Sequence, residues 1–103
     1  MYIIVLVTAK NIKEATKIAT VLVEEHLVAC ANIVNGVRSI FTWKGKMNKA
    51  DEVLLILKSK KSCFPKIVRK VKTMHSYDVP EVIAMPIIGG NQDYLDWIKD
   101  SCR

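Results

Sequence analysis

The chain has 103 residues, half of them hydrophobic, and 16 Lys and Arg outnumber 10 Asp and Glu to give a net charge of +6. This length is typical of one domain with its own core, so residues 1–103 are interpreted as a single domain. No apolar run is long enough to cross a bilayer, and the basic residues are scattered over turns and helix faces. Neither a membrane span nor a nucleic-acid-binding surface is therefore predicted.

Three cysteines lie far apart and form no C-x-x-C pair. This spacing argues against a disulfide framework and a structural zinc site, and it is typical of a reducing compartment. The chain also begins directly with an apolar strand pattern, without a basic leader or a cleavage site. We therefore expect a cytoplasmic protein.

The first half of the chain alternates strand and helix signals. Residues 1–8 are almost unbroken apolar and predict a strand buried on both faces. Asn11 and Glu14 form a capping-box-like start for an amphipathic helix that ends near His26, where a cation suits the helix dipole. A second strand pattern begins at residue 28, and its Asn35-Gly36 pair indicates either a hairpin turn or a bulge in one long strand.

The second half repeats this alternation. Lys44-Gly45 predicts a tight turn, and residues 52–58 return as an apolar strand. A helix follows around Pro65, then a loop, a last strand over residues 81–88, and a final helix capped by Asn91. The order β-α-β-β-α-β with an extra C-terminal helix predicts an α+β, ferredoxin-like fold.

The strand patterns also bear on assembly. Two helices cover one face of such a sheet, and an antiparallel sheet with its other face in water should alternate apolar and polar residues. Residues 3–7, 53–57 and 82–84 do not alternate. Either the terminal helix or another copy of the chain covers the second face, and a homo-oligomer is the preferred interpretation.

Candidate site residues are few, because no nucleophile elbow, metalloprotease helix, phosphate-binding loop or dinucleotide fingerprint is present. His75, Tyr77, Asp78 and Glu81 gather in one loop, where they can hold a cation, polarise a substrate or simply brace the loop. Cys30 is either a buried small hydrophobe or a soft-metal ligand.

Two further residues border these candidates in the sequence. Trp43 precedes the predicted turn, where it either packs the end of the hairpin or forms the wall of a cleft. Lys58 ends an apolar strand, as a charge that reaches solvent or as an anion contact.

Five segments together resemble the successive signatures of the CutA (divalent-cation tolerance) family. They occur in the same order as in that family and span nearly the whole chain: residues 29–33 (ACANI), 43–46 (WKGK), 52–58 (EVLLILK), 75–81 (HSYDVPE) and 94–97 (YLDW). The resemblance implies a ferredoxin-like protomer in a tight homotrimer, with long hairpins that reach neighbouring subunits. It favours one long bent strand over a hairpin at residues 35–36.

The resemblance also implies a site. Family members are associated with tolerance of divalent metals, some bind copper, and their shared polar residues line clefts between subunits that resemble the ligand clefts of PII-type signalling trimers. The matching cleft positions here are Cys30, Trp43, Lys58, His75, Tyr77 and Glu81. Of these, His75 and Cys30 are the expected metal ligands.

The chain departs from the family pattern near the expected metal ligands. Val7 and Met74 stand where copper-binding bacterial members carry a cysteine and a histidine, and Ser76 and Asp78 replace the usual loop residues. An identical copper site is therefore not expected.

Two functional hypotheses follow. The first is a non-enzymatic trimer that binds divalent or soft metal ions, copper foremost, or a small ligand at inter-subunit clefts, with no cofactor required. The second is a structural, anchoring or signalling trimer of PII-like type without a specific metal role. No role is assigned to Cys63 and Cys102.

Overall fold

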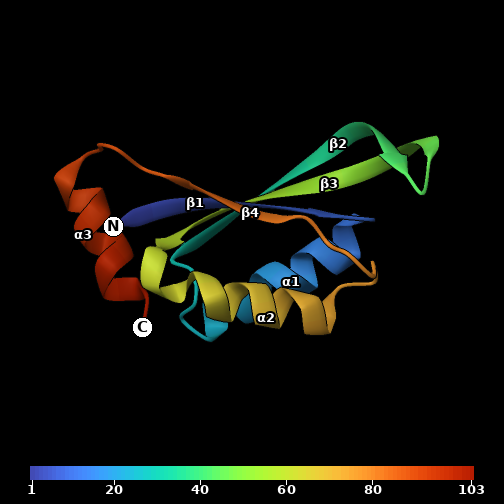
Figure 1. Cartoon of the computed structure of the whole chain (residues 1–103). Helices are drawn as coiled ribbons and strands as arrows, with labels where there is room; N and C mark the ends of the chain where they lie inside the picture. The colour runs from blue at the N-terminus through green and yellow to red at the C-terminus, as the bar shows by residue number, and fades with distance from the viewer.

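The computed structural model describes residues 1–103 as a four-stranded sheet with two helices on one face and a third helix at its end. The strands are β1 (Tyr2–Ala9), β2 (Cys30–Trp43), β3 (Lys46–Lys60) and β4 (Val82–Pro86), and the helices are α1 (Ile12–Glu24), α2 (Phe64–Met74) and α3 (Gln92–Ser101). Neighbouring strands are antiparallel in the order β2-β3-β1-β4. The predicted ferredoxin-like α+β fold with an extra terminal helix is confirmed (Figure 1). None of the helices has the length and apolar character needed to span a bilayer.

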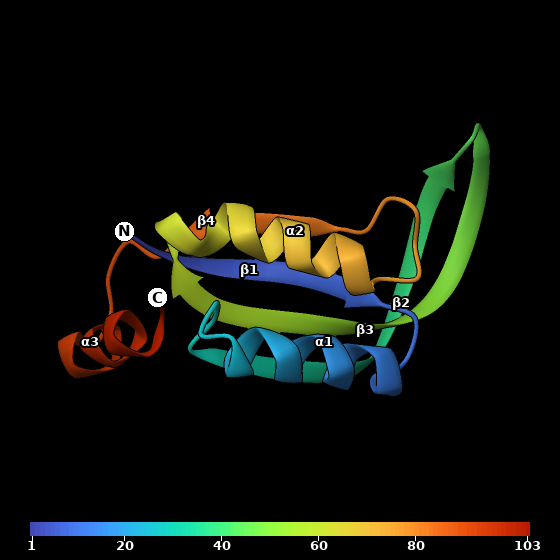
Figure 2. The same cartoon turned by 90° about the horizontal axis from the view of Figure 1, so that it is seen from below.

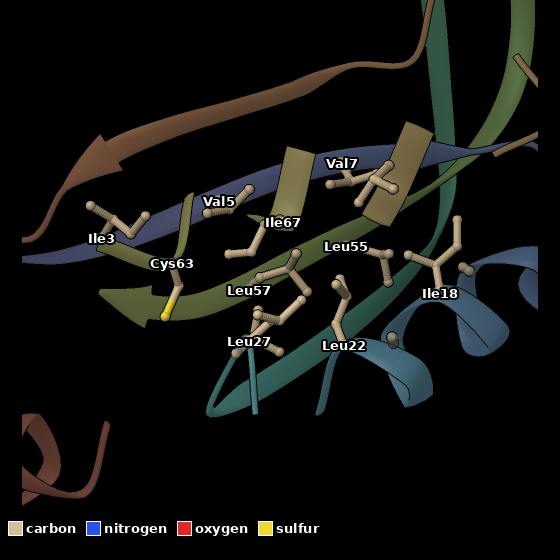
Figure 3. Packing of buried hydrophobic residues seen from close by; sticks show 14 of the residues in the cluster. Ile3, Val5, Val7, Ile18, Leu22, Leu27, Leu55, Leu57, Cys63 and Ile67 are labelled. Atoms are coloured by element: carbon tan, nitrogen blue, oxygen red, sulfur yellow. The ribbon is translucent and has the colours of Figure 1, made fainter. Parts of the chain in front are cut away.

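The core lies between the sheet and the two long helices. Every second residue of β1 is buried, and these side chains meet the inward residues of β3 and the apolar stripes of α1 and α2 (Figure 3). The largest fully buried members include Leu55 and Leu57 of β3, Ile18 and Leu22 of α1, and Ile67 of α2. The helical spacing predicted for these stripes is therefore the spacing that builds the core.

The opposite side of the sheet is apolar and largely uncovered, and we call it the open face. Its apolar residues lie in phase on the four strands: Ile4, Leu6, Val34, Leu54, Ile56, Ile83 and Met85. In β4, Ile83 is 52% exposed and Met85 is 45% exposed. Helix α3 packs at the end of the sheet near the N-terminus, so it does not lie across this face (Figure 2). The predicted burial of the strands on both faces is thus not achieved within one chain.

A β-bulge at Asn35 and Gly36 interrupts the pairing of β2 with β3. The register changes between Val34 and Val37, and Gly36 has a φ of +76°, which glycine adopts without strain. Asn35-Gly36 is therefore a bulge in one long strand. The extra residue in β2 changes which of its side chains point toward each face. Before the bulge the even-numbered residues of β2 lie on the open-face side, and beyond it the odd-numbered residues do, including Phe41 and Trp43.

Beyond the bulge, β2 and β3 continue as a hairpin that turns away from the body of the sheet (Figure 2). Its turn has positive φ at both Lys44 and Gly45, 52° and 77°, as a tight two-residue hairpin turn requires. The hairpin carries the exposed side chains of Ile40, Phe41, Trp43 and Met47.

The ends of α1 are defined by local hydrogen bonds. Asn11 Oδ1 accepts the N–H of Glu14 at 2.8 Å, which confirms the predicted cap. At the other end His26 adopts a φ of 59°, its N–H bonds Val23 O, and the N–H of Leu27 bonds Leu22 O. This is a Schellman motif, so His26 ends the helix through its backbone, while its ring lies 3.4 Å from Ser101 O.

Candidate functional site

A pocket opens where the base of the hairpin meets the loop between α2 and β4. Its volume is about 410 Å³, within the range of small-molecule sites. We call it the aromatic–acidic pocket, and it is lined by Thr8, Phe41, Trp43, Ala50, Glu52, Tyr77, Asp78 and Val79. The bulge at residues 35–36 is what places Phe41 and Trp43 on the same side as Glu52.

The carboxylate of Glu52 is the buried polar group of this pocket. Glu52 is only 8% exposed, and its Oε2 accepts a hydrogen bond of 2.8 Å from the hydroxyl of Tyr77. Burial, this hydrogen bond and the charge of Glu52 raise the pKa of Tyr77 to about 12. The phenol therefore stays protonated at neutral pH and keeps donating to Glu52.

Glu81 lies close enough to Glu52 to feel its charge. Burial and the charge of Glu52 raise the pKa of Glu81 above its usual 4.5. The carboxylate of Glu81 thus lies near that of Glu52, outside the pocket lining. Their mutual repulsion makes this position unfavourable for the ionised pair unless a cation is present.

Replacing Glu81 by glutamine tests this repulsion. Because its pKa is raised in the folded state, Glu81 favours folding when it is protonated, and this contribution is lost as the pH rises through the folded pKa. We expect Glu81→Gln to unfold at a higher temperature than the wild type at neutral pH, measured by circular dichroism without added cations. The difference should shrink below pH 4.5. A lower unfolding temperature at neutral pH would contradict the repulsion.

His75 braces the loop from the helix side, and its side chain is fully buried. Its Nδ1 accepts the N–H of Tyr77 at 3.0 Å, so its Nε2 carries the proton and donates to Thr8 O at 2.7 Å. The ring also packs against that of Tyr77 at 4.6 Å between centroids. Both nitrogens are therefore occupied, and metal ligation by His75 would require one of these hydrogen bonds to break.

The same loop is tied to α1 by Glu14. Its carboxylate accepts the N–H of Ser76 at 2.6 Å, the hydroxyl of Ser76 at 3.1 Å and the N–H of Lys10 at 3.3 Å. Burial raises the pKa of Glu14, but these hydrogen bonds lower it by more, so the net pKa lies below 4.5. Glu14 thereby fixes the loop that presents Tyr77 to the pocket.

Cys30 and Lys58 form a separate cluster at the other end of the open face. The two residues are register partners on β2 and β3, and both the Lys58 ammonium and the Cys30 thiol donate to Asn32 Oδ1. Burial and contact with Cys30 raise the pKa of Tyr94 on α3. Along β1 this cluster lies level with Ile4, whereas His75 bonds Thr8, four residues further along the strand.

The structure therefore divides the predicted cleft residues. Trp43 and Tyr77 line the pocket and Glu81 lies near its Glu52, whereas Cys30 and Lys58 lie apart, and His75 supports the loop from behind. In one protomer no three His, Cys, Asp or Glu side chains are placed to hold a metal ion, so one chain alone does not fit a complete metal centre. Cys63 and Cys102 are buried in the core near the C-terminus.

Glu52 and Glu14 were not among the predicted site residues. Glu52 had a detectable signal, because it is a charged residue in phase with Leu54 and Ile56 of an otherwise apolar strand. Glu14 was recognised only as a capping residue, since its bonds to Ser76 join residues 62 positions apart.

Comparison with known proteins identifies the family to which the sequence is similar. Residues 3–101 match the CutA1 divalent ion tolerance protein family. The divalent-cation tolerance protein CutA of Thermus thermophilus is 45% identical over 98 residues, which is 95% of each chain. The chloroplastic protein CutA of Arabidopsis thaliana is 46% identical over 98% of this chain, which spans 56% of that relative.

Solved structures of divalent cation tolerance proteins have the same fold as this chain. The divalent cation tolerance protein of Thermus thermophilus superimposes with a TM-score of 0.99 at 44% identity and full coverage of both chains. The protein described as the periplasmic divalent cation tolerance protein CutA of Archaeoglobus fulgidus gives a TM-score of 0.95 at 39% identity, covering 98% of each chain. The chain therefore belongs to the CutA1 family of divalent ion tolerance proteins.

Proposed function

We propose that this protein assembles as a homotrimer and serves divalent-cation tolerance by binding cations at clefts between its subunits. The observation that carries the proposal is the buried carboxylate of Glu52, which stands beside Glu81 at the end of the uncovered open face. Buried negative charge favours a bound cation, and the adjoining apolar surface favours a second subunit.

Three features support the homotrimer. The open face is apolar on all four strands, and β2 and β4 are edge strands whose outer backbone groups are free to pair with another copy. The hairpin also exposes large side chains between 43% and 74%: Ile40, Phe41, Trp43 and Met47. Head-to-tail contacts between a β2 edge and a β4 edge close into a ring when the rotation permits, and the ring we propose has three members.

Binding rather than catalysis is the proposed mode of action. The pocket holds a carboxylate and a phenol whose pKa is about 12, and neither forms a nucleophile–base pair with a neighbour. The three free cysteines support a cytoplasmic location.

Copper bound through His75 and Cys30 is the more specific form of the proposal. Cys30 offers a partly accessible thiol on the open face, where a second subunit can bring another ligand. Glu52 and Glu81 offer only oxygen, which favours hard cations such as Mn²⁺ or Mg²⁺. The two donor sets therefore select different metals.

One calorimetric titration tests both sets. The reduced, metal-free protein is titrated with copper(I), Zn²⁺ and Mn²⁺, and each variant is first shown by light scattering to keep its assembly. We expect Cys30→Ser and His75→Ala each to abolish copper binding, and Glu52→Gln with Glu81→Gln to abolish Mn²⁺ binding. A wild-type trimer that binds none of the three metals would contradict the cation-binding proposal.

A structural trimer is the second candidate. It is favoured by the observation that no buried side-chain nitrogen or oxygen lacks a hydrogen-bond partner. In that case Glu52→Gln would lower thermal stability while every metal titration of the wild type stays flat.

A further inference from the structure

The charge of Glu52 has no counter-charge in the protomer. The ion pairs of the chain join Arg38 to Asp51 and Lys70 to Glu25, and neither involves Glu52. Glu52 is nevertheless more than nine-tenths buried, and its only hydrogen-bond donor is the neutral hydroxyl of Tyr77. A buried carboxylate held in this way is costly unless a cation approaches it.

The walls of the aromatic–acidic pocket are aromatic and carry no positive charge, whereas Lys10, Lys13 and Arg38 line a separate hollow that Glu52 also borders. Trp43 and Phe41 are 47% and 43% exposed, and the ring of Tyr77 closes the pocket from the loop. None of the chain's 16 Lys and Arg residues lines the pocket, although they outnumber the acidic residues overall. Asp78 adds a further carboxylate at the lining.

These features distinguish between classes of cation. A hard divalent metal takes about six oxygen ligands, with waters completing the set, and it gains nothing from the ring faces of Trp43 and Phe41 that line this pocket. An alkylammonium ion needs only one carboxylate for its charge, and it gains from aromatic faces around its charged end and its methylene groups.

We propose that the aromatic–acidic pocket binds the ammonium end of an alkylamine, with the charge on Glu52 and the chain against Trp43 and Phe41. The inference rests on the proposed cation-binding function and names an organic class of cation for this pocket. An alkylammonium group has two sources here, a free amine and a lysine side chain of a second copy. The experiment separates them.

The probe is 1,5-diaminopentane, and the readout is the fluorescence of Trp43 in a Trp97→Phe background, because the chain has only two tryptophans. The neutral comparison compound is 1,5-pentanediol. We expect the diamine to change the emission of Trp43 saturably, and the diol to bind at least about tenfold more weakly. Calorimetry repeats the measurement without relying on Trp43.

Two variants should each lower the affinity of the protein for the diamine by about tenfold. Glu52→Gln removes the charge but keeps an acceptor for Tyr77, and Trp43→Leu, read by calorimetry, removes the ring face. Asp51→Asn is the matched control, since it removes a neighbouring carboxylate that is 83% exposed and pairs with Arg38 outside the pocket. Equal affinity for the diol, or unchanged affinity in Glu52→Gln, would overturn the inference.

Assembly identifies the source of the amine. The same titration is run on the wild type and on Ile83→Lys, whose substitution lies on the open face away from the pocket lining. Binding to both supports a free amine, and binding to the monomeric variant alone supports a lysine of a second copy. Binding to neither overturns the inference, and Mn²⁺ binding that Glu52→Gln abolishes would then leave the metal-binding proposal standing.

Discussion

Replacing Ile83 by lysine is expected to convert the proposed trimer into monomers. Ile83 is 52% exposed on the edge strand β4, in line with Leu6 and Ile56 of the open face, so a lysine there does not disturb the folded protomer. In the assembly, however, its ammonium group would be buried against apolar side chains without a partner, which costs several kcal/mol for each subunit. Light scattering should show the mass falling from three chains to one chain of 11.6 kDa.

The matched control is Ile12→Lys. Ile12 is also apolar and 43% exposed, but it opens α1 on the helical side of the sheet. This variant should keep the mass of the wild type. Equal masses for the wild type and Ile83→Lys, or dissociation caused by Ile12→Lys, would refute assembly through the open face.

Glu14→Gln is expected to lower the free energy of unfolding by about 2 kcal/mol at neutral pH, because it weakens a set of charge-assisted hydrogen bonds. The Glu14 side chain is 11% exposed and joins α1 to the loop that carries Tyr77. Because its pKa is lowered in the folded state, Glu14 stabilises the fold above pH 4.5, and this contribution is lost as the pH falls through the folded pKa.

Denaturant unfolding at a fixed protein concentration measures this effect at neutral pH and at about pH 3. The deficit of Glu14→Gln should be large at neutral pH and smaller at the acidic pH, because the contribution of the wild-type carboxylate is lost as the pH falls through its folded pKa. Glu24→Gln, an exposed position on the same helix, is the control and should change little at either pH. A deficit of equal size at both values would mean that charge is not the cause.

The sequence was a good guide to the elements because their signals are local. The capping of α1 by Asn11, the turn at Lys44-Gly45 and Pro65 in the first turn of α2 each depend on residues within one helical turn or hairpin. The helical spacing of Ala15, Ile18 and Leu22 likewise predicted their burial correctly.

The structure shows where the site residues assigned by resemblance lie, and their roles stay predictions. The residues assigned by resemblance include Trp43 and Tyr77, which line the pocket, and Glu81, which lies near Glu52, but the resemblance gave no distances between them. It placed Cys30 with His75 as metal ligands, and within one chain these residues lie at different ends of the sheet. The roles of Glu52 and Glu14 depend on partners 25 and 62 residues away, which local patterns do not contain.

The sequence by itself determined the order of strands and helices, the ferredoxin-like fold and the CutA family, because hydrophobic spacing, caps and turn residues act over short distances. Only the tertiary structure decided that residues 35–36 form a bulge, that this bulge turns Phe41 and Trp43 toward Glu52, and that both nitrogens of His75 are occupied. These outcomes depend on strand register and on contacts between distant segments. One residue of register moves a side chain to the other face of a sheet, and no local propensity fixes that choice.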